Sequence, residues 1–93
     1  LYWIDAQGET NVIQRANPDG TQVESLVVGG IAGARGLALD VRAEMMYWVT
    51  RDSDRIQRAS LDGTNVEDLV TAGLDSAYGL ALDLEARKMY WTD

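Results

Sequence analysis

A 43-residue internal repeat runs through this chain and constrains its fold more than any other feature. When residues 12–50 are aligned with residues 55–93 without a gap, 22 of 39 positions are identical. Repeats of this length form solenoid units or β-propeller blades, each of which needs a neighbour to bury its faces. The most similar paired segments are 13–16 with 56–59, 19–21 with 62–64, 36–40 with 79–83, and 46–48 with 89–91.

Each repeat predicts four short β-strands joined by short links. Asp62-Gly63 predicts a tight hairpin turn, because glycine supplies the positive φ that such a turn needs. Short links join antiparallel neighbours, so the repeat predicts a four-stranded meander. Glycine or Asp-Gly interrupts every dozen residues or so, and helices are not expected. In the second repeat the strands are predicted at residues 36–41, 45–50, 55–60 and 66–71.

Composition and charge exclude several classes of function. The 8 basic and 15 acidic residues give a net charge of −7, and such a surface repels nucleic acids and anionic membranes. No stretch reaches the roughly 20 apolar residues of a membrane span, so no membrane insertion is expected. Cysteine and histidine are absent, which removes thiolate metal sites and the commonest general base. We therefore expect no enzyme, no cofactor and no metal site.

Tyr-Trp pairs at three repeat-related positions identify the kind of sheet assembly. The pairs are Tyr2-Trp3, Tyr47-Trp48 and Tyr90-Trp91. Adjacent strand residues point to opposite faces of a sheet, so both faces need apolar cover. A two-layer sandwich leaves one aromatic of each pair exposed, whereas blades in a ring cover each other on both faces. The pairs therefore predict a propeller with the three Trp side chains buried between blades.

These pairs lie in segments that resemble the signature strand of YWTD repeats, also called LDL-receptor class B repeats. The signature segments are residues 1–5, 46–50 and 89–93, and the Gly-Leu-Ala-Leu-Asp and Asp-Gly-Thr motifs also match the family pattern. Two signature strands depart from it, with Ile4 in place of Thr and Val49-Thr50 in place of Thr-Asp. The resemblance implies an all-β, six-bladed β-propeller. It also implies an extracellular or cell-surface location, protein partners and no enzymatic activity.

The resemblance divides the chain into about two blades of the ring. Residues 1–28 supply strands two to four of one blade, residues 36–71 a full blade, and residues 79–93 the first two strands of the next. The other blades are expected from the same parent chain or from identical copies. The expected function is a protein-interaction scaffold that binds a protein or peptide ligand. The alternative is an oligomeric carbohydrate-binding propeller assembled from two-blade chains.

Ligand contacts are predicted where the repeats differ from each other. In a meander, the loops between strands two and three and between strand four and the next strand one share one face of the ring. In the family this face often binds partners, and Arg and Tyr are enriched at binding hot spots. The contact candidates on this face are Gln7, Glu9, Asn11, Arg35, Arg51, Asp52, Asp54, Asp75 and Tyr78.

Several acidic residues are predicted to stabilise the blades rather than bind a ligand. Asp40 and Asp83 end apolar strands, where a carboxylate accepts backbone or hydroxyl hydrogen bonds, and this is favoured over a channel cation. Asp52-Ser53-Asp54 lacks the glycine and distal glutamate of a calcium loop. The other motif residues expected to have structural roles are Tyr2, Trp3, Asp5, Tyr47, Trp48, Tyr90, Trp91, Thr92 and Asp93.

Overall fold

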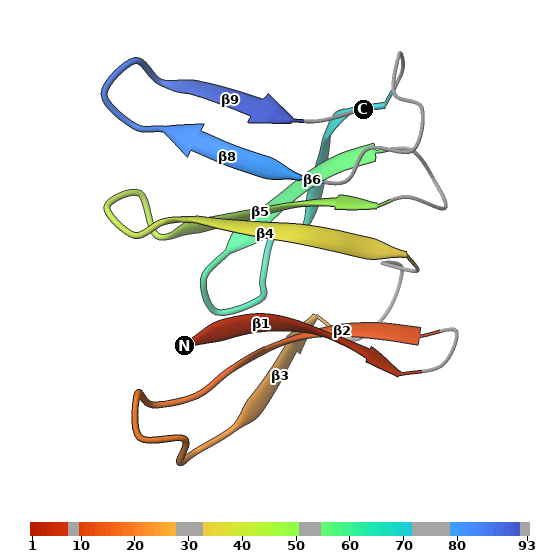
Figure 1. Cartoon of the computed structure of the whole chain (residues 1–93), viewed down its shortest axis with the longest axis vertical. Helices are drawn as coiled ribbons and strands as arrows, with labels where there is room; N and C mark the ends of the chain where they lie inside the picture. The colour runs from red at the N-terminus through yellow and green to blue at the C-terminus, as the bar shows by residue number, and fades with distance from the viewer. Residues whose placement is uncertain (8–9, 28–32, 51–54, 72–78, 92–93) are drawn as a thin grey trace.

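The computed structural model describes residues 1–7, 10–27, 33–50, 55–71 and 79–91, which form antiparallel sheets and turns (Figure 1). None of the described segments forms a helix of the length and apolarity that a bilayer crossing requires. The strands are β1 (Tyr2–Gln7), β2 (Thr10–Arg15) and β3 (Glu24–Val27) in the first sheet, β4 (Ala34–Asp40), β5 (Met45–Thr50), β6 (Arg55–Ser60) and β7 (Glu67–Val70) in the second, and β8 (Leu80–Asp83) and β9 (Lys88–Trp91) in the third.

The second sheet is the four-stranded meander that the repeat predicts. The predicted strands at residues 45–50 and 55–60 are confirmed as β5 and β6. The first strand begins two residues earlier than predicted, at Ala34, because a bulge at Gly36, where φ is 55°, lets pairing continue past the glycine. The fourth strand is shorter than predicted and starts at Glu67, since Asn65 still has the positive φ of a turn residue.

The three sheets stack face to face, with the second sheet between the other two (Figure 1). β4 contacts β1 on one side and β8 on the other, so the stack is aligned along its inner strands. This is the arrangement of successive blades in a propeller and leaves the second sheet covered on both faces.

β5 carries the apolar core on both of its faces. Met46 and Trp48 are fully buried and lie in a cluster with Ile13 of the first sheet. On the other face, Val49 is fully buried in a second cluster against which Met89 of the third sheet packs. Because successive side chains of a strand point to opposite faces, β5 contributes buried residues to both neighbouring interfaces.

The burial of the three Trp side chains differs from the prediction. Trp48 is fully buried, Trp3 is partly buried and Trp91 is 38% exposed. Trp48 has described sheets on both sides and β6 beside it, whereas Trp91 lies on the outer strand of a two-stranded sheet. The predicted burial is therefore confirmed for Trp48 and wrong for Trp91 in this structure.

A repeated Trp–Gln hydrogen bond satisfies the indole N–H. Trp48 Nε1 donates to Gln57 Oε1 at 3.1 Å, and Gln57 Nε2 donates in turn to Asp68 Oδ1 at 2.7 Å. In the first sheet, Trp3 Nε1 donates to Gln14 Oε1 at 3.0 Å. The two pairs have the same chemistry but differ in burial, because Trp48 is enclosed and Trp3 is not.

Replacing Gln57 with Leu should destabilise the fold more than the matched change Gln14→Leu. Gln57→Leu leaves the enclosed Trp48 N–H without an acceptor, which costs about 1–3 kcal/mol. Water can replace the acceptor for the less buried Trp3, so we expect about 0.5–1 kcal/mol for Gln14→Leu. Urea denaturation followed by circular dichroism measures both values. Equal losses in the two variants would contradict the burial argument.

Candidate functional site

The links between strands lie on two opposite sides of the stack, as expected for an antiparallel meander. β1 and β5 end on one side in Figure 1, where β4 and β8 begin. The links at residues 41–44, 61–64 and 84–87 lie on the opposite side. The predicted ligand-contact face is the side at which β1 and β5 end.

Only three of the predicted contact residues lie in the described part of the chain. Gln7 ends β1, and Arg35, near the start of β4, is exposed. Asn11 is 9% exposed, and its Nδ2 donates to the Ala34 carbonyl oxygen at 3.0 Å. Its amide thus links the first two sheets, and its role as a ligand contact stays a prediction. The candidates outside the described residues are Glu9, Arg51, Asp52, Asp54, Asp75 and Tyr78.

The repeated aspartates at the strand ends cap turns. The backbone N–H of Ala43 donates to Asp40 Oδ1 at 3.1 Å, and Ala86 donates to Asp83 Oδ1 at the same distance. Bonds of this kind are what a structural carboxylate would make, and the structural role of the two residues stays a prediction. Within the described residues, no cluster of three or more His, Cys, Asp or Glu side chains could hold a metal ion. Thr92 and Asp93 lie outside the described residues.

The link at residues 61–64, here called turn 61–64, docks onto the first sheet. Arg15 Nη1 donates to the Leu61 carbonyl oxygen at 3.0 Å, and the Leu61 side chain packs against the apolar cluster around Ile13. A Cβ placed on Gly63 would lie 2.6 Å from the Leu26 carbonyl oxygen, so the turn backbone lies directly against β3. The turn is therefore held by one hydrogen bond, apolar packing and close backbone contact.

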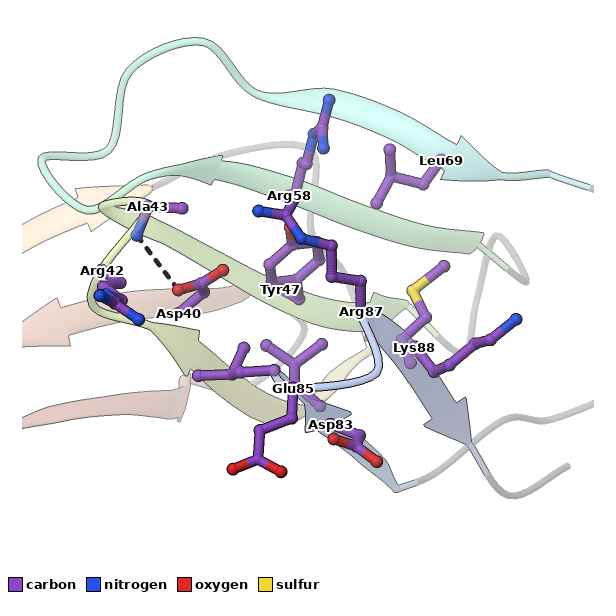
Figure 2. A pocket seen from close by; sticks show the side chains of 13 residues that line it. Asp40, Arg42, Ala43, Tyr47, Arg58, Leu69, Asp83, Glu85, Arg87 and Lys88 are labelled. Atoms are coloured by element: carbon purple, nitrogen blue, oxygen red, sulfur yellow. Dashed lines mark hydrogen bonds between the residues drawn. The ribbon is translucent and has the colours of Figure 1, made fainter.

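The residues that contact turn 61–64 have equivalents one repeat later, and these equivalents line a groove between the second and third sheets (Figure 2). Arg58, Tyr47 and Leu69 line this groove and are the repeat equivalents of Arg15, Tyr2 and Leu26. The cavity has a volume of about 1010 Å³. The residues that line the groove are Asp40, Arg42, Ala43, Tyr47, Arg58, Leu69, Leu82, Asp83, Leu84, Glu85, Arg87, Lys88 and Met89.

The electrostatics of Arg58 in the groove repeat those of Arg15. Arg58 Nε pairs with Glu67 Oε1, and Arg15 Nε pairs with Glu24 Oε1. The Glu67 carboxylate, and after it the Tyr47 hydroxyl, raise the pKa of Arg58 above its ordinary value. Arg58 therefore stays a fixed cation in the groove.

Sequence reasoning missed this groove. The links at residues 41–44 and 84–87 that border it lie on the face opposite to the predicted contact face. The available signal was the repeated arginine at positions 15 and 58 combined with the repeated Asp-Gly turn. Those matches indicate that the strands of the two repeats are equivalent. They do not indicate that the arginine of one blade binds the turn of the next.

Gly63→Ala should destabilise the protein more than Gly20→Ala. The two glycines have nearly the same φ, 89° and 86°, so both variants share the cost of about 1–2 kcal/mol for a side chain at positive φ. Only Gly63 lies against another sheet, and the forced contact with Leu26 adds about 1–3 kcal/mol. Chemical denaturation of both variants isolates this difference. Equal destabilisation would show that the docked turn can move away from β3 at no cost.

The turn should make stability depend on pH below about 4. The Thr64 hydroxyl and backbone N–H, and more weakly the Arg15 charge, lower the pKa of Asp62 below 3.8. A carboxylate with a lowered folded-state pKa stabilises the fold above the unfolded value and loses this contribution in acid. The advantage of the wild type over Asp62→Asn should therefore shrink between pH 7 and about pH 3, as urea midpoints would show. An advantage of the same size at both pH values would contradict the assignment.

Comparisons with known proteins agree with the fold. No protein-family profile matches the chain. Over 54 residues, 58% of the chain, it is 39% identical to a human low-density lipoprotein receptor-related protein 5-like protein, and the match covers 21% of that protein.

A solved structure gives a longer match. One chain in a crystal structure of a nidogen/laminin complex superposes with a TM-score of 0.90 and 32% identity, over 99% of this chain and 34% of that one. The chain thus spans about a third or less of the length of these relatives. Together with the Tyr-Trp strands and the stacked four-stranded sheet, these similarities show that the chain belongs to the YWTD, or LDL-receptor class B, repeat family and is built of β-propeller blades.

Proposed function

We propose that the chain is a non-enzymatic segment of a YWTD β-propeller that acts as a protein-interaction scaffold outside the cell or at its surface. The observation that carries this proposal is the similarity, over nearly the whole chain, to a chain in a nidogen/laminin complex. The similarity to a receptor-related protein supports the same class of function. The ligand is a protein or peptide, and the other blades of the ring complete the scaffold.

The architecture suits a rigid display of loops. Met46, Trp48 and Val49 of β5 are fully buried, so the stack offers little freedom to the strand ends that carry the loops. Arg35 lies exposed near the start of β4, on the predicted contact face. A planar guanidinium on a rigid strand is a good anchor for a partner, because little conformational entropy is lost on binding.

Four of the described aspartates accept hydrogen bonds within turns, which is a structural role. Asp40 and Asp83 cap turns, and Asp19 and Asp62 accept hydrogen bonds from the threonine two residues later. A hydrolytic mechanism needs a general base near a reacting group, and the sequence contains no histidine. The scaffold proposal therefore includes neither a catalytic step nor a cofactor.

The exposed aromatics of the described residues do not favour the carbohydrate-binding alternative. Tyr90 is 59% exposed and Trp91 is 38% exposed, and among the described aromatics only this pair on β9 offers an exposed surface to a sugar. The equivalent Trp48 is buried, and the partly buried Trp3 has its indole N–H bonded to Gln14. A sugar site repeated between blades would need the same exposure at each motif strand, so we favour a protein ligand.

Binding to immobilised laminin and nidogen tests the proposed function. We expect measurable binding to one of them, and Arg35→Glu should weaken it about tenfold or more, because interface arginines are frequent hot spots. Arg42→Glu is the matched control, since Arg42 is an exposed arginine of the same sheet on the opposite face. It should bind like the wild type.

Two results would contradict the proposal. An absence of binding to both proteins would remove the support that the nidogen/laminin similarity gives to the partner class. An equal loss for Arg35→Glu and Arg42→Glu would show attraction by net charge rather than contact through the predicted face.

A further inference from the structure

We propose that Arg55 is a further ligand-contact residue of this chain and that it binds a carboxylate of the protein partner. Arg55 begins β6 on the predicted contact face, because β6 is antiparallel to β5 and starts on the side at which β5 ends. The inference rests on the proposed function and deepens it, since it names a residue and a chemical class for the contact. The contact candidates from the sequence do not include Arg55, which lies inside a predicted strand.

A chain of hydrogen bonds leads from the buried core to the Arg55 guanidinium. Trp48 Nε1 donates to Gln57 Oε1 at 3.1 Å, and Gln57 Nε2 donates to Asp68 Oδ1 at 2.7 Å. The other oxygen of this carboxylate, Asp68 Oδ2, accepts from Arg55 Nη1 at 3.1 Å. Because Trp48 is fully buried, Asp68 is held from the core and holds the guanidinium in turn.

Arg55 is exposed even though its own backbone is anchored. The Thr50 hydroxyl donates to the Arg55 carbonyl oxygen at 3.4 Å, whereas the Arg55 side chain is 45% exposed. Gln57 and Arg55 lie on the same face of the sheet as Trp48, which packs with Ile13 of the first sheet. The exposure of Arg55 is therefore found with the neighbouring sheet in place. The strand presents a fixed guanidinium to solvent.

The first sheet keeps the Trp-Gln pair but has no guanidinium at this place. Val12 stands at the repeat position of Arg55 and is 4% exposed, and Ser25 stands at the position of Asp68. Gln14 Nε2 donates to Ser25 Oγ at 3.3 Å, so the glutamine has an acceptor without an acid. The blade thus folds in the first repeat without the ion pair.

Three positions at which the repeats differ meet around this one guanidinium. Besides Arg55 and Asp68, the third is Thr50, which stands where the first signature strand has Asp5. A carboxylate cannot donate to a backbone carbonyl as the threonine hydroxyl does. Exposed ion pairs contribute little to stability, so stability does not account for this concentration of differences. Ligand contacts are predicted where the repeats differ, and this place meets that condition.

The geometry of the guanidinium matches a carboxylate. A guanidinium carries five N–H donors in one plane, and pairs of them fit the two oxygens of a carboxylate. Within the described residues, Arg55 donates one side-chain hydrogen bond, to Asp68, which orients this plane. A side chain that is oriented before binding loses little conformational entropy when the partner docks.

Arg55 and the predicted contact Arg35 lie at the same edge of the second sheet. Ala34 pairs with Thr50, and Thr50 pairs with Arg55, so the two arginines belong to adjacent rungs on the strands that flank β5. Two strand spacings place their backbones about 10 Å apart. An extended segment of a partner covers this distance with about three residues. The two arginines can therefore contact one partner segment.

Binding to immobilised laminin and nidogen tests Arg55 through single variants. Arg55→Ala should raise the dissociation constant about tenfold. Arg55→Lys should recover only part of the affinity, because it keeps the charge but not the planar donors. Arg58→Ala is the matched control and should bind like the wild type, since Arg58 also pairs with an acid of β7 but lies on the other face of β6. Amidation of the partner's carboxylates should remove the difference between the wild type and Arg55→Ala.

A double-mutant cycle separates the orientation of Arg55 from a general structural effect. Asp68→Ser introduces the residue of the first repeat and releases the guanidinium, which should raise the dissociation constant about three- to tenfold. In the Arg55→Ala background the same change should leave binding unaltered, because Asp68 acts through Arg55. Circular dichroism checks that each variant is folded. An equal effect of Asp68→Ser in both backgrounds would overturn the positioning role of Asp68.

The outcomes distinguish this inference from the proposed function. Binding of the wild type to neither protein would contradict both. Binding that Arg35→Glu weakens and Arg55→Ala leaves unchanged would keep the scaffold function and overturn the role of Arg55. A difference between the wild type and Arg55→Ala that persists on the amidated partner would overturn the carboxylate as the ligand group.

Discussion

The need to cover large side chains on both faces of one strand is the constraint on which the rest of this structure depends. Tyr47 and Trp48 point in opposite directions, so a single layer of neighbours cannot cover both. The second sheet meets this demand with one sheet on each side, and Trp48 becomes fully buried while Val49 packs in the opposite cluster. A single blade of this kind would expose apolar residues on both faces, so its stability depends on packing against the neighbouring sheets.

Polar groups complete those interfaces where apolar packing ends. Asn11 donates across the sheets to the Ala34 carbonyl oxygen, and Arg15 donates to the Leu61 carbonyl oxygen. Both bonds satisfy backbone oxygens with side-chain donors from the neighbouring sheet. The contacts are also asymmetric, because one blade supplies the arginine and the strand that the turn packs on, and the next blade supplies the turn. The stack therefore has a direction along the chain.

Sequence patterns predicted local structure well and burial less well. β5 and β6 were predictable because alternation and the flanking turns define strand bounds locally. The exposure of Trp91 was not predictable from its motif, since burial depends on which strands lie beside it. The positive φ of Gly63 follows from the Asp-Gly turn, but its contact with Leu26 depends on how two sheets stack. The groove combines residues from both neighbouring sheets, and most predicted contact residues lie outside the described ranges.

The three repeat-equivalent tryptophans give this chain a graded set of optical probes. Trp48 is enclosed, Trp3 is partly covered and Trp91 reaches solvent, while the first two bond to a glutamine. Indole emission shifts with polarity, so one chromophore reports on three different depths at the same position of the repeat. The emission spectrum thus records how many blade neighbours each unit has, and a change of neighbours would be visible without any added label.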